Sequence, residues 1–364
     1  MDFSKCIPAV FVIEDRYEIL VHTKKNGIIS VIIGDQRYYE ENSGILYSEK
    51  NYAKISVPQE ELNLHKKYTI SFYETIEKKI HFSQLGPEQL YTFSFKPIEK
   101  TENINIYYLS DIHGDFDLAV KAANYFGDNL DLLIVNGDLC EFTTLNSYIE
   151  VANFLGKASK GIVPIVLSRG NHDTRGRYSE LFTDYFPNIN KKVFYQFSIG
   201  PIEGVVLDLG EDKLDSHPEY GNTNNFYDYR RKELKFIEKV EPLNSSYKIA
   251  ISHICPPIYT IKTEECFHIE HELNTKFSRH LERIGIDFIL SGHFHKTYFL
   301  DSYSDTAIIK VNYPIIVGTV KGENYVCGSA ITLKQNEIII KVTDNNNNVV
   351  QEKIMNIQKK QFIK

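Results

Sequence analysis

The sequence predicts two structural units: an all-β sandwich of immunoglobulin or fibronectin type over residues 1–100, followed by an α/β unit over residues 101–364. Short β-rich runs separated by turn-prone pairs fill the first hundred residues, which is typical of an antiparallel sandwich. Strand-length apolar runs then alternate with helical stretches, as in sheets with buried, largely parallel strands. The polar segment 97–103, which begins with a proline, separates the two patterns and is the best domain boundary.

Six runs in the N-terminal region have the residue types of strands. They are residues 9–13, 17–21, 28–33, 53–57, 68–73 and 91–95. Pairs such as Asn26-Gly27 and Gly34-Asp35 supply the turns between several of them. The sequence of this region holds no cluster with metal-ligand spacing, so we expect it to be structural or to shape the rim of a neighbouring site.

After the boundary, strands and helices are expected in alternation. Strands are expected at 104–109, 131–135, 161–167, 193–198, 204–209, 248–251 and 286–290, and helices at 117–124, 144–158, 229–240 and 267–284. The tail then reads as strands without helices between them, at 307–311, 315–320, 330–333, 337–343 and 349–355. We expect these last strands to complete a second sheet that packs against the first.

Composition and charge narrow the class of protein. The hydrophobic share of 42% and the charged share of 24% are those of an ordinary globular protein. The net charge of −7 provides no positive excess to attract nucleic acid or an anionic membrane, so we expect neither partner. We find no signal-peptide pattern and no apolar run of transmembrane length. The five scattered cysteines predict reduced thiols and a cytoplasmic location.

Polar residues of metal-binding types follow five of the predicted strands. The clusters occupy residues 110–115, 136–139, 170–173, 252–254 and 291–295. In open α/β sheets ligands gather at the carboxyl ends of the strands, so all five clusters can meet at one edge. Imidazoles, carboxylates and an amide oxygen suit first-row divalent ions. Asp138 can bridge two ions because a carboxylate offers two oxygens.

The order of these clusters resembles the calcineurin-like metallophosphoesterase superfamily over about residues 104–333. The motifs are Asp111-x-His113, Gly137-Asp138, Gly170-Asn171-His172-Asp173, His253 and Gly292-His293-x-His295. The resemblance implies a catalytic domain built as a four-layer sandwich of two sheets flanked by helices, with two divalent ions (Mn, Fe, Zn, Co or Ni) at one end. By motif position, the ligands of the first ion would be Asp111, His113, Asp138 and His295, and those of the second Asp138, Asn171, His253 and His293.

Three differences from the motifs of related phosphatase groups narrow the choice of subfamily. Asp138 is followed by Leu139-Cys140-Glu141, without the Asp-Arg-Gly of protein serine/threonine phosphatases. Glu141 stands where purple acid phosphatases carry a metal-bound tyrosine, and their first motif lacks a counterpart of His113. A β-sandwich before the catalytic domain is nevertheless similar to the layout of plant purple acid phosphatases. The chain is therefore identified as a non-purple relative with that arrangement.

The expected reaction is hydrolysis of phosphoesters of small or modest size. A hydroxide bridging the two ions would be the nucleophile, and His172 the general acid that protonates the leaving group. Asp173 is expected to orient the His172 ring. Arg169 and Arg175 are expected to bind the non-transferred phosphate oxygens, or alternatively to pair with surface carboxylates.

Two other functions stay open from the sequence. A nuclease of the same superfamily would need a basic groove, which the net acidity does not favour. A catalytically silent scaffold on the same fold would show broken ligand sets, whereas these are complete. The polar segment 211–226 is either a substrate lid or a solvated insertion.

Overall fold

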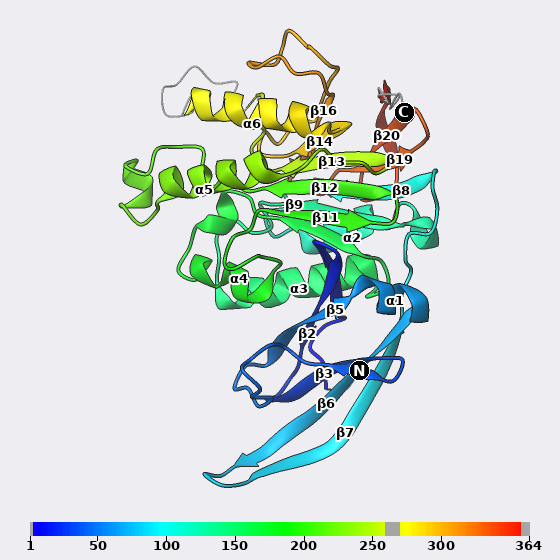
Figure 1. Ribbon diagram of the computed structural model, residues 1–364, viewed down its shortest axis with the longest axis vertical. Coiled ribbons are helices and arrows are strands. Elements are labelled where there is room, and N and C mark those ends of the chain that lie inside the picture. The colour runs from blue at the N-terminus through cyan, green and yellow to red at the C-terminus, as the bar shows by residue number, and fades with distance from the viewer. Residues whose placement is uncertain (1–2, 259–269, 358–364) are drawn as a thin grey trace.

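In a computed structural model, which describes residues 3–258 and 270–357, two large sheets pack face to face between layers of helices (Figure 1). The α/β class, with further β-rich regions near both ends of the described chain, is confirmed. In the described part of the chain, no helix is both long enough and apolar enough to cross a membrane.

The first sheet has nine strands in the order β21-β20-β19-β8-β9-β10-β1-β2-β5. Their bounds are β1 Ala9–Ile13, β2 Arg16–His22, β5 Tyr52–Pro58, β8 Ile104–Leu109, β9 Leu132–Asn136, β10 Ile165–Ser168, β19 Gly328–Leu333, β20 Glu337–Thr343 and β21 Val349–Asn356. The four central strands β8, β9, β10 and β1 are parallel, and the strands toward both edges are antiparallel. The carboxyl ends of β8, β9 and β10 therefore lie along one border.

The second sheet has six strands in the order β11-β12-β13-β14-β16-β15. Their bounds are β11 Tyr195–Ile199, β12 Ile202–Leu207, β13 Tyr247–Ser252, β14 Phe288–Ser291, β15 Tyr298–Leu300 and β16 Ile315–Val317. Strands β12, β13, β14 and β16 are parallel, which again places their carboxyl ends together.

Alternating side chains of the strands build the layers. On β8, Ile104, Ile106 and Tyr108 enter the core between the two sheets, whereas Tyr107 and Leu109 face the opposite side. That outer side is covered by α2 (Phe116–Ala123) and α3 (Leu145–Ser159). The outer face of the second sheet is covered by α5 (Phe226–Lys239) and α6 (His271–Ile284). The expected sandwich with helices on both faces is thus present.

The N-terminal region pairs differently from the expected self-contained sandwich. Only β3 (Gly27–Ile33), β4 (Gln36–Tyr38), β6 (Lys67–Lys78) and β7 (Ser83–Ser94) form a separate four-stranded sheet, while β1, β2 and β5 belong to the nine-stranded sheet. Val31 and Tyr68 share one continuous core with Ile106. The strand pairing therefore crosses the boundary expected near residue 100, because the free edge of β10 is completed by β1.

The tail also differs from expectation. Residues 307–311 form no strand, although Ala307, Ile309 and Val311 are buried beside the second sheet. Strands β19, β20 and β21 extend the first sheet, because β19 pairs with β8 (Ala330 opposite Tyr107). Only β16 joins the second sheet as expected.

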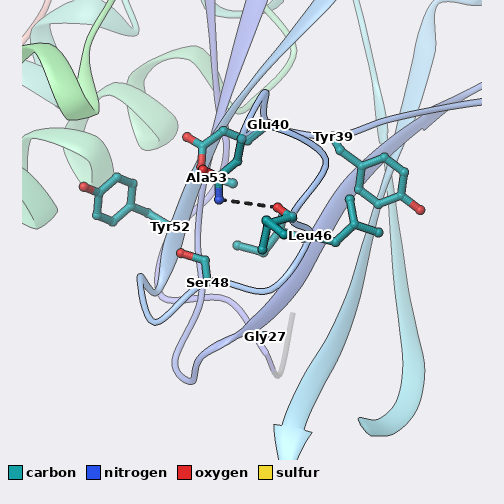
Figure 2. A pocket seen from close by; sticks show the side chains of 10 residues that line it. Gly27, Tyr39, Glu40, Leu46, Ser48, Tyr52 and Ala53 are labelled. Atoms are coloured by element: carbon teal, nitrogen blue, oxygen red, sulfur yellow. Dashed lines mark hydrogen bonds between the residues drawn. The ribbon is translucent and has the colours of Figure 1, made fainter. Parts of the chain in front are cut away.

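A small pocket lies between the β4–β5 loop and strands β3 and β5 (Figure 2). Tyr39, Leu46 and Ala53 are among the residues that line it. Its volume is about 20 Å³, which is space for about one water molecule. This pocket is therefore part of the packing rather than a substrate site.

Candidate metal centre

The seven predicted metal ligands lie in the loops that follow five strands of the two sheets. Asp111 and His113 follow β8, Asp138 follows β9 and Asn171 follows β10. His253 follows β13 of the second sheet, and His293 and His295 follow β14. In the structure each of these seven side chains lies close to at least one other of the set, and together they form one connected cluster.

The four residues expected at the first ion converge. Asp111, His113, Asp138 and His295 each place one ligand atom within 4.8 Å of the others. The Nε2 atom of His295 is 3.1 Å from Nε2 of His113 and 3.5 Å from Oδ1 of Asp111. Two imidazole nitrogens and two carboxylates at this spacing suit a divalent ion.

The residues expected at the second ion form two close pairs. His253 Nε2 lies 3.2 Å from Asp138 Oδ2, and His293 Nδ1 lies 3.0 Å from Asn171 Oδ1. The rings of His253 and His293 have their centroids 5.7 Å apart. Asp138 Oδ2 is also 3.7 Å from His113 Nε2, so this one oxygen faces a histidine of each ligand set.

The hydrogen bonds of His253 show that its Nε2 atom suits a cation. His253 Nδ1 lies 2.8 Å from the carbonyl oxygen of Asn136, which can only accept, so Nδ1 carries a proton. The buried Nε2 has no hydrogen-bond partner in the described structure, although the Asp138 carboxylate is beside it. Burial opposes a charge on His253, but the carboxylates of Asp138 and Asp111 outweigh it and raise the pKa of His253 to about 10, so the site favours positive charge between Nε2 and Asp138. A divalent ion can take the place of that second proton. The donor set therefore fits a metal ion.

The pKa values of the other predicted ligands also favour binding of a cation. Burial lowers the pKa of His113 and of His293 to about 4, so both rings are neutral near pH 7 and offer a lone pair. Burial raises the pKa of Asp111. Burial also opposes ionisation of Asp138, but the neighbouring histidines, His253 foremost, together outweigh it and hold the pKa of that carboxyl well below its usual range.

Five of the predicted ligands have an unusual backbone conformation. The φ angles of Asp111, His113, Asp138, His293 and His295 lie between 47° and 74°. This left-handed region is uncommon for residues with a side chain, and such residues concentrate at functional sites. The strand-end loops therefore hold these side chains in positions that unconstrained turns would not favour.

Two glycines allow the loops after β9 and β10 to touch. A Cβ atom on Gly170 would lie 2.3 Å from the backbone nitrogen of Asp138, and one on Gly137 would lie 2.3 Å from the nitrogen of Gly170. The backbone N–H of His172 donates to Asp138 Oδ1 at 2.8 Å. This close approach fixes Asp138 against the Gly170–Asp173 loop.

His172, the predicted general acid, lies beside the centre. Its ring centroid is 4.7 Å from that of His113. Its Nδ1 lies 2.9 Å from the carbonyl oxygen of Glu141, which can only accept, so Nδ1 carries a proton and Nε2 is the atom that exchanges one. That Nε2 lies 3.5 Å from Nη1 of Arg175.

The orienting role expected for Asp173 needs correction. Asp173 is buried, and its two oxygens accept hydrogen bonds from the backbone N–H groups of Leu139 (3.0 Å) and Gly170 (2.9 Å). The carboxylate thus ties the β9 loop to the β10 loop, while Glu141 orients the His172 ring.

The two arginines have different partners. Arg169 donates to Asp208 at 2.6 Å and is nearly buried among aromatic rings. It thus pairs with a carboxylate, but with a buried one rather than with the surface carboxylate of the alternative, and its substrate role stays a prediction. Arg175 binds Glu211 through Nε (2.7 Å) and Nη2 (2.8 Å), and its Nη1 points toward His172. Arg175 therefore remains beside the centre.

Three acidic residues that sequence reasoning did not assign to the site are in contact with it. Glu141 Oε2 is 3.1 Å from His113 Nδ1, Asp212 Oδ2 is 3.6 Å from His293 Nε2, and Glu211 holds Arg175. Glu211 and Asp212 follow β12, so the rule that ligands gather at strand ends would have selected them. The same contacts fix the start of the 211–226 segment against the centre, and the role of this segment as a lid stays a prediction.

Comparisons with solved structures agree with the fold. Two solved structures share the fold: purple acid phosphatase PPD1 from yellow lupin (Lupinus luteus) seeds (9% identity, TM-score 0.61, covering 96% of this chain and 74% of that one) and PhoD (11% identity, TM-score 0.57, covering 97% and 89%). No curated protein matches the sequence significantly.

The family model of calcineurin-like phosphoesterases matches residues 104–297, which is more than half of the chain. This stretch contains all seven residues of the metal-ligand arrangement described above and His172. The family expected from the motifs is confirmed: the chain belongs to the calcineurin-like phosphoesterase family.

Proposed function

We propose that this protein is a metal-dependent phosphoesterase that hydrolyses small phosphoesters at a centre of two divalent ions. The observation that carries the proposal is the position of Asp138 Oδ2, which faces His113 at 3.7 Å and His253 at 3.2 Å. This position, between two histidine-containing ligand sets, supports a role of the carboxylate as a ligand of both ions. Two such ions would supply an activated water and a clamp for the phosphoryl oxygens.

The protein's own residues would perform the remaining steps. His172 would deliver a proton from Nε2 to the departing oxygen, since its Nδ1 proton is engaged with the Glu141 carbonyl. Arg175, fixed by Glu211, would attract the anionic substrate next to that nitrogen. Asn136 would keep the tautomer of His253 constant through its carbonyl oxygen.

The test combines metal analysis with turnover. We expect about two ions per chain after reconstitution with Mn²⁺ or Zn²⁺, and hydrolysis of an aryl phosphate monoester or of the matching diester. Asp138→Asn should reduce both metal content and turnover, while Asp128→Asn, which changes an exposed carboxylate away from the centre, should change neither. Metal-free, inactive protein would favour the silent scaffold, and cleavage confined to nucleic acid would favour the nuclease.

A further inference from the structure

A second groove lies away from the predicted metal ligands, between α5 and the segment that leads into β11. Its volume is about 380 Å³, within the range of pockets that bind small molecules. None of the predicted site residues lines it. Its polar lining consists mainly of lysines, namely Lys192, Lys232, Lys235 and Lys239, with Glu14 as the one carboxylate among the described lining residues.

Three of these lysines share one face of α5. Positions 232, 235 and 239 are three and four residues apart, so their side chains project in the same direction. Like charges at this spacing repel each other and destabilise a helix. All four lysines are exposed, and within the described residues none of them forms an ion pair with a carboxylate. The neighbouring Lys191, in contrast, pairs with Asp184. The groove thus concentrates uncompensated positive charge in a chain whose net charge is −7.

The floor of the groove is apolar and packed. Phe194 and Phe236 lie with ring centroids 5.2 Å apart, and Phe194 is buried. The ring centroids of Phe194 and Tyr229 are 5.5 Å apart. The Tyr229 hydroxyl in turn donates a hydrogen bond to Asp208, which is the ion-pair partner of Arg169. Three of the lysine side chains therefore project from the packed helix α5, whereas Lys192 lies in the connection between α4 (Phe182–Tyr185) and β11.

A neighbouring acidic groove limits what can bind. This groove, of about 540 Å³, shares Glu14 and Gln196 with the basic one and is also lined by Asp15, Glu203 and Glu241. A long polyanion such as a nucleic acid strand would have to pass these carboxylates, and like charges brought together are disfavoured. The charge pattern therefore selects a compact anion that ends within the basic groove.

We propose that this lysine-lined groove binds a short oligophosphate, either inorganic or as the phosphate chain of a nucleotide. Ammonium groups act as point charges for phosphate oxygens, and four of them match an anion with several negative charges. This binding is independent of the proposed hydrolysis, because the two sites share no residue.

The experiment measures binding of hydrolysis-resistant imido analogues of tripolyphosphate and of ATP to the full chain by calorimetry. The triple variant K232Q/K235Q/K239Q should bind at least about tenfold more weakly, since each exposed charge pair contributes up to about fivefold. The matched control K24Q/K67Q/K121Q removes three exposed lysines outside the groove and should retain the affinity. Raising the salt concentration should weaken binding to the unaltered protein and to the control.

The outcomes separate the two phosphate sources and the competing explanations. Equal affinity for both analogues would assign recognition to the phosphates alone, and tighter binding of the ATP analogue would add a contribution from the nucleoside. No binding by the unaltered protein, equal weakening in the two triple variants, or tight binding of single-stranded DNA that the groove lysines control would each overturn the proposal.

Discussion

At the scale of single residues, the hydrogen bond between His172 and the Glu141 carbonyl fixes which ring nitrogen is available for proton transfer. We predict that His172→Ala slows hydrolysis of alkyl phosphoesters by about a hundredfold or more, but slows aryl esters much less, because aryl leaving groups depart without a proton. Turnover of paired alkyl and aryl substrates measures this difference. His81→Ala, an exposed histidine on the β6–β7 hairpin, is the control. Equal losses on both substrates would rule out the general-acid role.

Glu211 is a positioning residue for Arg175. It is almost fully buried and accepts hydrogen bonds from Arg175, from Thr174 (3.0 Å) and from Tyr220 (2.8 Å). Glu211→Gln removes the charge that holds the guanidinium, so we expect KM for a phosphoester to rise severalfold with a smaller change in kcat, because ground-state binding is weakened.

The matched control for this prediction is Glu219→Gln. Glu219 also approaches Arg175 (3.4 Å) but is exposed, so its contribution is screened by solvent. Steady-state kinetics on both variants, with circular dichroism to verify folding, measure the difference. A larger effect of Glu219→Gln would contradict the assignment.

The sequence could predict which residues line the centre, but not all of their partners. Asp111, Asp138 and His253 follow strands directly, and parallel strands bring their ends together whatever the loops do. Arg169 and Asp173, in contrast, take their partners from tertiary packing. Asp208 lies 39 positions from Arg169, and the backbone N–H that binds Asp173 Oδ1 belongs to another loop. No local pattern encodes such pairings.

At the scale of elements, the contact between the β9 and β10 loops depends on the absence of a side chain at Gly170. Gly170→Ala would place a Cβ 2.2 Å from Asp138 Oδ1 and displace this carboxylate. We predict a loss of metal affinity of about tenfold or more with an intact global fold, because supporting contacts orient metal ligands. Metal titration with circular dichroism tests this.

Gly86→Ala in β7 provides the control for that substitution. A Cβ there would meet its nearest neighbour at 3.6 Å, which is an ordinary contact. Unchanged metal affinity in Gly170→Ala would show that the two loops adapt without moving Asp138.

The strand β1 shows why the expected N-terminal sandwich was only partly right. All five residues from Ala9 to Ile13 are buried, whereas a half-exposed sandwich strand would alternate. A continuous apolar run indicates burial on both faces, but it does not indicate the partner. β1 pairs in parallel with β10, more than 150 residues later, while β3 and β6 pair locally. Local strands were predictable, and the distant pairing was not.

At the scale of the whole molecule, the predicted metal ligands connect both sheets, so bound ions should stabilise them. Carboxylates and imidazoles from β8, β9, β13 and β14 loops converge there, so bound ions would add their binding free energy to folding. We predict that a chelator lowers the unfolding midpoint by about 5 °C or more. The shift, measured by calorimetry, should shrink in His253→Asn. An equal shift in that variant would place the stabilising ion elsewhere.

The stability of the molecule should also depend on pH through His22. This residue is 1% exposed, stacks on Tyr185 and has no hydrogen-bond partner for either ring nitrogen in the described structure. Burial lowers the pKa of His22 from 6.5 to about 4. Between pH of about 6.5 and 4 the unfolded chain takes up a proton that the folded chain does not, so stability falls by about 3 kcal/mol as the pH drops through this window.

Urea unfolding at several pH values measures this effect, with His22→Phe as the comparison because it preserves the stack with Tyr185. The free energy of unfolding of the unaltered protein should decrease more steeply below pH of about 6.5 than that of the variant. Parallel pH profiles would show that His22 does not control acid sensitivity.

The nine-stranded sheet takes β1, β2 and β5 from one end of the sequence and β19, β20 and β21 from the other, on either side of β8, β9 and β10. During synthesis on the ribosome, β1 has no parallel neighbour until β10 has emerged, and β8 keeps an open edge until β19 follows. Such non-local pairing makes folding slow and leaves strand edges exposed to other nascent chains. Chaperone dependence during translation is therefore an expected property of this topology.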